Sequence, residues 1–299
     1  MVQETNITTI KNFNSELLNW SIFIFLALIW GSSFKLMKIG MEELSSYQVA
    51  SLRILSAGVL FLPITIKNLR NYDLKTIFLI ICSGLAGNFI PAYLFCMSET
   101  KIDSSLAGII NSAMPIFVII LGLLFFNLKV NNKKILGVTI SFIGLSLLLI
   151  SKVTIDLSSS FFLFLAILAT ILYAINSNLI AKVLKNIKSM DIISISMSLL
   201  AIPAFLVLFF TNYFTKISLD KNFLVSTGAS VFLGMFGTAI ASGVFYVLIK
   251  RTSSVFAASV TNVMPIVAIL WGILSGENIT LLQIFYFSII MTGVYITSK

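Results

Sequence analysis

Histidine is missing from this 299-residue sequence, and charged residues make up only 10% of it. The lack of histidine excludes HExxH zinc sites and pairs of a nucleophilic serine with a histidine base. An intramembrane aspartate pair is absent as well, because all five aspartates fall in loops or at the ends of apolar segments: Asp73, Asp103, Asp156, Asp191 and Asp220. The sequence therefore argues against an enzyme, and we expect no catalytic residue, bound metal or cofactor.

Long apolar segments make up most of the chain. Hydrophobic residues account for 58% of it, and the charged fraction is well below the roughly 25% that is typical of soluble domains. Segments of roughly 17 to 25 apolar residues recur between short polar breaks, and each is about long enough to cross the ~30 Å hydrocarbon core as a helix. They lack the two-residue alternation of β-barrel strands. We therefore expect an all-α polytopic membrane protein with ten transmembrane helices, at about 20 to 39, 46 to 66, 75 to 98, 102 to 126, 134 to 151, 159 to 182, 190 to 213, 224 to 249, 254 to 275 and 280 to 298.

The net charge of +9 reports membrane topology. Basic residues are spread singly between the spans and do not gather on one face, so we expect no nucleic-acid partner. With the N-terminus inside, thirteen basic residues fall in inside segments and six outside. The positive-inside rule then places both termini in the cytoplasm of a multi-pass cell-membrane protein. Residues 1–19 form a polar cytoplasmic tail without the features of a cleaved signal peptide.

The second half of the chain repeats the first at an offset of 150 residues. From residue 84 to 126, 12 of the 43 residues are identical to those 150 positions later, without a gap. Gly84 matches Gly234, Gly87 matches Gly237 and Phe95 matches Phe245, and further matches run through the Met-Pro pairs described below. The chain then divides into the tail, a first repeat at 20–151 and a second repeat at 152–299.

Five spans in each repeat, an odd number, require the second repeat to enter the membrane upside down relative to the first. The charges agree, because Lys129, Lys133 and Lys134 follow the fourth span, whereas the equivalent stretch after the ninth has Glu277 and no basic residue. Such inverted repeats suggest alternating access around a site near the membrane midplane. A duplication with only a structural role is the alternative.

A Met-Pro pair lies midway along the fourth and ninth spans, in NSAMPI at 111 to 116 and TNVMPI at 261 to 266. Pro115 and Pro265 cannot donate to the carbonyls four residues before them, so each helix has a freed acceptor and an expected bend near its centre. In hydrocarbon such a carbonyl must face protein or a water-filled cavity. A polar lining of the substrate path is therefore one interpretation of Asn111, Ser112, Thr261 and Asn262. A kink satisfied by local side chains is the other.

Further polar residues fall at comparable places in other spans. Trp30 and Ser33 lie in the first span, and Tyr173 and Asn176 lie in the sixth. Asn88 and Thr238 mark the third and eighth spans similarly, beside the glycines that match between the repeats. Packing is the alternative role for the aromatic residues, and close helix contact is the alternative for the glycines.

Three ionisable residues intrude on the spans, namely Lys35, Arg53 and Glu99. Burying such groups is costly, which makes them candidates for a gate or for coupling. We expect Arg53 and Glu99 to pair across the second and third helices, and Lys35 to reach the outer mouth. A structural clamp and a substrate contact are both compatible with this pattern.

These features are similar to the EamA-type carriers of the drug/metabolite transporter (DMT) superfamily. The likeness covers about residues 20 to 298 and rests on WGSSF at 30 to 34 with Lys38, SLRI at 51 to 54, GNFIPAYLF at 87 to 95, IDSSLAGIINSAMPIF at 102 to 117 and GE at 276 to 277. The resemblance implies two inverted five-helix repeats that export small metabolites, typically amino acids. It also implies that helices one, three, four, six, eight and nine line a central cavity, which places these residues near the path: Trp30, Ser33, Asn88, Asn111, Tyr173, Asn176, Thr238 and Asn262. Lys35 and Glu99 depart from the family pattern.

We therefore expect an inner-membrane secondary transporter that exports a small neutral or zwitterionic metabolite, such as an amino acid, by alternating access. A passive channel or facilitator and a drug efflux carrier are the alternatives, but the first span lacks the carboxylate that a cationic-drug antiporter needs. A strongly anionic substrate is disfavoured because no basic residue is expected near the midplane. Glu99 is the candidate for proton coupling. The expected partners are the substrate and the lipid bilayer, with a monomer as the working assumption.

Overall fold

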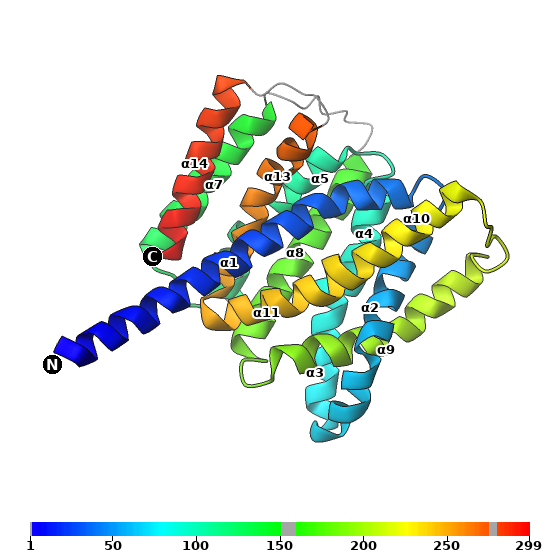
Figure 1. The fold of residues 1–299 in the computed structure, drawn as a ribbon, viewed down its shortest axis with the longest axis horizontal. Helices are drawn as coiled ribbons and strands as arrows, with labels where there is room; N and C mark the ends of the chain where they lie inside the picture. The colour runs from blue at the N-terminus through cyan, green and yellow to red at the C-terminus, as the bar shows by residue number, and fades with distance from the viewer. Residues whose placement is uncertain (1, 151–159, 275–279) are drawn as a thin grey trace.

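The structure, a computed structural model, describes residues 2–150, 160–274 and 280–299, and it contains no strand in these ranges (Figure 1). The predicted boundary between the repeats, at 151 and 152, lies outside the described residues. The first half of the chain forms α1 (Val2–Gly40), α2 (Ser46–Asn68), α3 (Leu74–Gly84), α4 (Ile90–Ser98), α5 (Ser104–Asn111), α6 (Met114–Phe125) and α7 (Asn132–Ile150). The second half forms α8 (Ser160–Lys182), α9 (Ser189–Phe210), α10 (Lys221–Phe232), α11 (Ala241–Arg251), α12 (Ser254–Ala258), α13 (Val260–Leu274) and α14 (Leu281–Ser298).

Six helical stretches are long and apolar enough to cross a membrane: Ser15–Gly40, Ser46–Asn71, Leu74–Ser98, Ser160–Lys182, Ser189–Phe210 and Lys221–Arg251. Shorter apolar helices occur at Met114–Phe125, Ser254–Val267 and Ile284–Ser298. Large apolar side chains such as Phe210 and Leu74 are exposed on the surface, whereas many serine, threonine and asparagine side chains are buried. This arrangement confirms a multi-pass, all-helical membrane protein.

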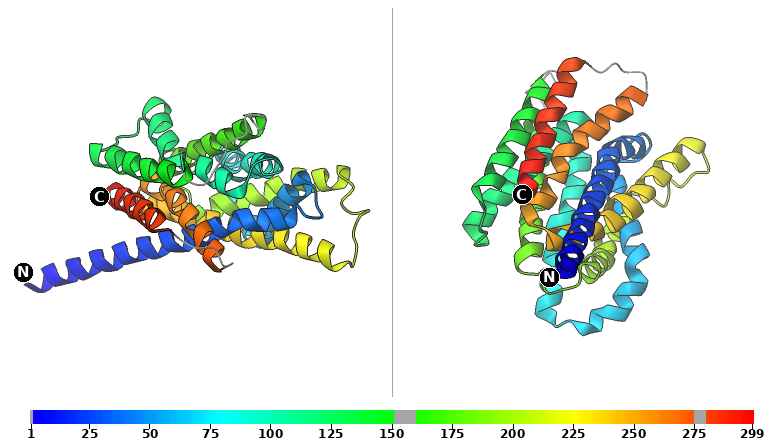
Figure 2. Two further views of the ribbon diagram at one scale, coloured as in Figure 1. Left: turned by 90° about the horizontal axis from the view of Figure 1, so that it is seen from above. Right: turned by 60° about the vertical axis from the view of Figure 1, so that its left-hand side comes forward.

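The two halves of the chain interleave. The most extensive helix contacts join α2 to α9, α7 to α14, α1 to α13 and α4 to α8, each pair taking one helix from each half. The α7–α14 pair lies at one edge of the bundle, and the N-terminal turns of α1 extend beyond the other helices (Figures 1 and 2). Space at the centre of the bundle is therefore enclosed by residues from both halves.

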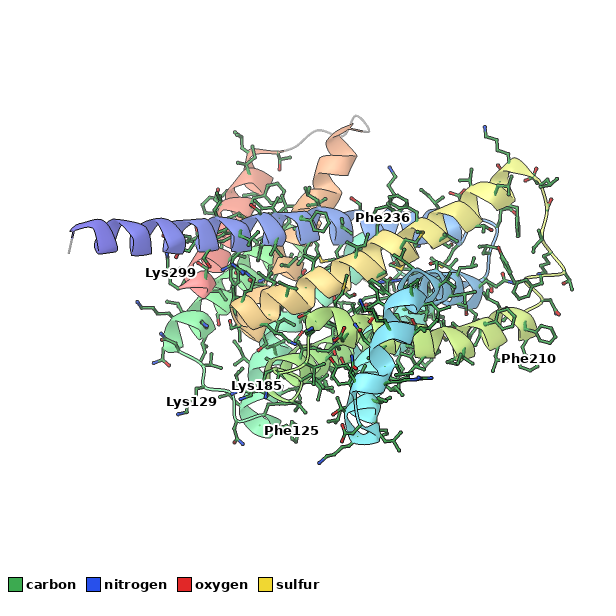
Figure 3. The ribbon with its side chains drawn as sticks, turned by 60° about the horizontal axis from the view of Figure 1, so that its bottom comes forward. Phe125, Lys129, Lys185, Phe210, Phe236 and Lys299 are labelled. Atoms are coloured by element: carbon green, nitrogen blue, oxygen red, sulfur yellow. The ribbon has the colours of Figure 1, made fainter. Side chains whose placement is uncertain are left out.

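The two chain ends lie at the same end of the bundle (Figure 1), where the Lys299 ammonium lies 3.9 Å from the Glu16 carboxylate. Figure 3 shows Lys129 and Lys185 toward this end as well, and Phe210 toward the opposite end. Three of the lysines that the positive-inside rule assigns to the cytoplasm, Lys129, Lys185 and Lys299, thus lie toward one end of the molecule.

Short π-helical segments interrupt the third and eighth predicted spans at matching positions. Leu85–Phe89 separates α3 from α4, and Leu233–Ile240 separates α10 from α11. The glycines that match between the repeats lie in or beside these segments and allow close contact with other helices. A Cβ atom added at Gly84, for example, would lie 2.6 Å from the Cβ atom of Ser196 on α9. Such π-helical turns often occur at functional sites.

The bends expected at the two prolines take different forms. Pro115 lies in the first turn of α6, after an interruption of the helix at residues 112 and 113. Pro265 lies inside α13, and the turn that separates α12 from α13 comes earlier, at Ser259. The prolines match under the 150-residue offset, but the helix breaks do not, so the two halves are not equivalent here.

The α7–α14 contact depends on small residues, which permits a matched stability test. A Cβ atom added at Gly293 would meet backbone atoms of Ser141 and Gly137 on α7, whereas one added at Gly228 on α10 would meet nothing within 4 Å. We expect Gly293→Ala to lower the stability by about 1–3 kcal/mol, the usual cost of overpacking. Gly228→Ala should raise it by about 0.4–1 kcal/mol through helix propensity and chain entropy. Thermal denaturation in detergent measures both, and equal shifts would argue against this packing.

Candidate functional site

A cavity with about 630 Å³ of empty space, its open part included, lies at the centre of the bundle. Helices of both halves contribute to its wall, including α1, α2, α8, α11 and the two Met-Pro helices. It brings together seven residues predicted for the substrate path and one predicted for a gate or coupling: Trp30, Ser33, Asn88, Asn111, Tyr173, Asn176, Thr261 and Arg53.

Aromatic rings form much of the wall, and the sequence analysis missed several of them. Trp30 packs edge-on against Phe245 at 5.0 Å between ring centroids, and Phe95 stacks on Tyr173 at 5.8 Å. Phe34 lines the cavity as well. The sequence contained a signal for two of these residues, because Phe95 and Phe245 are identical under the 150-residue offset of the repeat.

Trp30 is fixed by one of the π-helical segments. Its indole Nε1–H donates a hydrogen bond of 2.8 Å to the backbone carbonyl of Gly237. Gly237 lies in the segment Leu233–Ile240, so the first helix of the first half is tied to the eighth predicted span. Buried Trp N–H groups need such a partner, and this one orients the ring along the cavity wall.

A hydrogen-bonded amide network forms another part of the wall. Asn88 and Asn176 both donate to the Tyr246 hydroxyl, at 3.1 and 3.2 Å. Ser242 donates to the Asn88 carbonyl at 2.8 Å, and Ser83 donates to the Asn176 carbonyl at 2.6 Å. Ser83 and Asn88 belong to the first half and the other three residues to the second. A change in this network would therefore alter how the two halves meet at the cavity.

The two Met-Pro helices meet beside the cavity, and Met114 and Met264 both line it. Pro265 leaves the Thr261 carbonyl without its helical donor. Ser112 of the other half donates its hydroxyl to this carbonyl at 2.7 Å. The freed acceptor is thus satisfied across the two halves, as the kink interpretation of the sequence requires, while Asn111 and Thr261 face the cavity.

Three residues predicted for the substrate path do not line the cavity in this conformation. Ser112 lies behind the wall, held by the Thr261 carbonyl, and Thr238 accepts a hydrogen bond from Arg53. Asn262 is 1% exposed, and neither polar atom of its side chain has a hydrogen-bond partner. Asn262 is one position out of register with Asn111 under the repeat, which explains why only Asn111 faces the cavity.

The expected pairing of Arg53 with Glu99 is wrong. The Arg53 Nε–H group donates to the Thr238 hydroxyl, and Nη1 lies 3.9 Å from the Met37 sulfur. The Arg53 side chain also reaches the cavity and is 7% exposed, so the cavity wall includes a basic residue. Helix rotation, which hydropathy does not encode, turns Arg53 toward the eighth span.

Glu99 follows Ser98, the last residue of the span Leu74–Ser98, and it is 1% exposed. Ser104 donates to Oε2 at 2.8 Å, while Oε1 has no hydrogen-bond partner. Lys38 donates to the backbone carbonyl of Glu99 at 2.5 Å and not to its carboxylate. Burial raises the pKa of the Glu99 carboxyl to about 7, although Ser104, Lys38 and Arg53 act to lower it. This carboxyl can therefore gain and lose a proton near neutral pH.

Lys35 lies away from the cavity. It is exposed and lines a groove on the side of the bundle, between α1 and the stretch that includes Phe232, Leu233 and Phe236. Figure 3 shows Phe236 on the outer surface there. The geometry thus separates Lys35 from Arg53, which the sequence analysis grouped together.

A buried carboxylate outside the cavity also escaped the sequence analysis, which placed every aspartate in a loop or at a span end. Asp191, in the first turn of α9, is 4% exposed and accepts hydrogen bonds from Asn68 at 2.8 Å and from the Tyr72 hydroxyl at 2.5 Å. Burial and the Asp191 carboxylate raise the pKa of Tyr72 to about 12. The cluster joins the end of α2 to the start of α9 and thus links the two halves. In the part of the chain that the structure describes, no group of three His, Cys, Asp or Glu residues is placed to hold a metal ion.

Comparison with known proteins agrees with this architecture. The chain matches the EamA-like transporter family over residues 18–150 and again over 160–299. It is 27% identical to an "Uncharacterized transporter" of Archaeoglobus fulgidus, with 94% of this chain and 98% of the relative covered. It is 22% identical to the "Probable amino-acid metabolite efflux pump" of Salmonella typhimurium, with 91% and 92% covered. A solved crystal structure shares the fold, with a TM-score of 0.70 at 12% identity over 93% of this chain and 95% of the other. Since the family match takes in both halves, the chain belongs to the EamA-like transporter family of the DMT superfamily.

Proposed function

We propose that the protein is a secondary transporter of the cell membrane that exports a small neutral or zwitterionic metabolite, such as an amino acid. The observation that carries the proposal is the central cavity, which helices of both halves enclose. Its wall combines aromatic rings with the side-chain amides of Asn88, Asn111 and Asn176. Apolar pockets with a few convergent polar groups are typical binding sites for small molecules.

In this proposal ten transmembrane helices form two inverted five-helix repeats, with both termini in the cytoplasm, and they expose the cavity to the two sides in turn. Matching residues of the two repeats support this symmetry, because Phe95 and Phe245, and likewise Met114 and Met264, line the same cavity. Inverted repeats typically place the substrate site at the interface between repeats. The lysines gathered at the end that holds both termini (Figure 3) agree with that end being cytoplasmic.

A metabolite is favoured over a cationic drug. The described residues that line the cavity include no carboxylate that would balance a cationic drug. Two relatives, from Salmonella typhimurium and Escherichia coli, are named as probable amino-acid metabolite efflux pumps. A passive channel differs from the proposed carrier in its kinetics, and exchange experiments distinguish the two.

Uptake of a metabolite panel into proteoliposomes tests the proposal, with Asn111→Ala as the informative variant. Asn111 faces the cavity and its carbonyl has no partner, so we expect its loss to reduce uptake about tenfold, the effect of one lost polar contact in a buried site. Asn262→Ala is the matched control, because it removes the same type of side chain at a position that does not line the cavity. This variant should keep most of the uptake. Normal uptake by Asn111→Ala, or no uptake of any solute by the folded wild type, would contradict the proposal.

A further inference from the structure

Arg53 is the one charged side chain among the described residues that line the cavity. The other lining residues are aromatic, apolar, hydroxyl, amide or thioether groups. A guanidinium remains charged at any pH that a protein meets. The cavity therefore holds a fixed positive charge in surroundings where an unbalanced charge is costly.

The contacts of Arg53 leave part of its guanidinium available to a solute. A guanidinium has five N–H donors in a planar fork that matches the two oxygens of a carboxylate. One donor is used by the Thr238 hydroxyl, a further side-chain hydrogen bond joins the guanidinium to the Tyr173 hydroxyl, and Nη1 faces the Met37 sulfur, a weak acceptor. The described carboxylates form no ion pair with it. Thr238 and Tyr173 hold the group in place, and with five donors the guanidinium keeps others that can bind an anionic group.

The rest of the cavity fits an apolar body. The pair of Trp30 and Phe245 and the pair of Phe95 and Tyr173 present rings to the same space. Because the described residues that line the cavity include no carboxylate, the acceptors that they offer to an ammonium group on the solute are all neutral. The charge pattern of the wall thus distinguishes between the two ends of a zwitterion.

We infer that the cavity selects solutes with a carboxylate on an apolar body, that the Arg53 guanidinium binds this carboxylate, and that an ammonium group on the solute is dispensable. The inference rests on the proposed function. It narrows the substrate class to small monocarboxylates, among them zwitterionic amino acids. Arg53 is then the residue that determines specificity for the charged end of the solute.

Ligand-induced thermal stabilisation of the purified protein in detergent tests the inference, because it measures binding without transport. Three probes share one aromatic body: phenylalanine has a carboxylate and an ammonium, 3-phenylpropionate has only the carboxylate, and phenylalaninamide has only the ammonium. We expect the first two to stabilise the wild type at similar concentrations. Phenylalaninamide should need a concentration at least about tenfold higher, as expected for the loss of charge-assisted hydrogen bonds.

Variants of Arg53 test whether this residue binds the carboxylate of the probe. Arg53→Gln should raise the half-saturating concentration of 3-phenylpropionate about 10- to 100-fold. Arg53→Lys should raise it less, since lysine keeps the charge but loses the planar fork. Arg70→Gln makes the same substitution at an exposed arginine and should bind as the wild type does. If Arg53→Gln does not fold, the inference is tested by the binding of the three probes to the wild type and by the binding of 3-phenylpropionate to Arg53→Lys.

Two outcomes separate the inference from the function on which it rests. If the amide probe, or the uncharged 3-phenylpropanamide, binds as tightly as the acid, the inference is overturned and the proposed transport function stands. If the folded protein binds none of the probes and transports no member of the metabolite panel, both are overturned.

Discussion

Gly87→Leu is expected to lower uptake into proteoliposomes by at least about tenfold while the protein still folds, since small displacements in a binding site often cost this much or more. Gly87 lies in the π-helical segment Leu85–Phe89 and lines the cavity. A Cβ atom at this position would come within 2.5 Å of the Asn176 side-chain Cγ. Leucine must therefore displace Asn176, which breaks its hydrogen bonds with Ser83 and Tyr246, and its side chain occupies space that the solute needs.

The matched control for this prediction is Gly228→Leu. A Cβ atom at Gly228 meets nothing within 4 Å, so the same substitution adds a side chain in open space. We expect its uptake to stay within about twofold of wild type, the usual range for surface changes. Size-exclusion profiles of both variants report whether they fold. Wild-type uptake by a folded Gly87→Leu variant would show that the solute takes a different path.

Binding of 3-phenylpropionate is expected to become tighter as the pH falls through about 7, because the buried Glu99 carboxyl takes up a proton in this range. Arg53 acts electrostatically on Glu99. When Glu99 is ionised, its charge offsets part of the positive charge that the solute carboxylate meets, and protonation removes this offset. The probe stays ionised, since free carboxylic acids titrate near pH 4.

The size of this effect follows from linkage. If bound carboxylate raises the Glu99 pKa by about 0.5 to 1 unit, its affinity changes about three- to tenfold between pH about 8 and about 6. Glu99→Gln should remove the pH dependence, while Glu42→Gln, at an exposed acid near the same end of α1, should keep it. Because protonation of Glu99 strengthens binding of the solute, binding of the solute also favours protonation of Glu99. Solute and proton thus bind together, as proton-coupled transport requires. An unchanged pH dependence in Glu99→Gln would assign the coupling group elsewhere.

Hydropathy predicted the six helical stretches that are long and apolar enough to cross a membrane, because segment length and the cost of unsatisfied backbone in hydrocarbon restrict the options. The repeat pointed to the cavity for a similar reason, since the identical Met114 and Met264 lie where the two halves meet. Phe95 and Phe245 carried the same signal. The sequence analysis used the identity of Phe95 and Phe245 under the 150-residue offset as evidence for the duplication, and it did not use this identity to predict residues that line the cavity.

The contacts between helices could not be predicted from the sequence. The rotation of α2 that directs the Arg53 side chain to Thr238 depends on packing between helices, which hydropathy does not encode. The proline pattern also predicted a bend near the centre of each helix, yet one break lies at residues 112 and 113, just before Met114 and Pro115, and the other lies at Ser259, six residues before Pro265. Asn111 and Asn262 were both expected near the substrate path, and the one-residue shift in register between them leaves only Asn111 at the cavity.

Solute counterflow in proteoliposomes tests alternating access most directly. Vesicles are loaded with unlabelled phenylalanine and diluted into a trace of labelled phenylalanine. A carrier whose cavity opens to one side at a time exchanges the two, so labelled solute should accumulate transiently above its equilibrium level, and Gly87→Leu should abolish this overshoot. A monotonic approach to equilibrium by the wild type, at a rate above that of protein-free vesicles, would instead identify a passive channel and contradict alternating access.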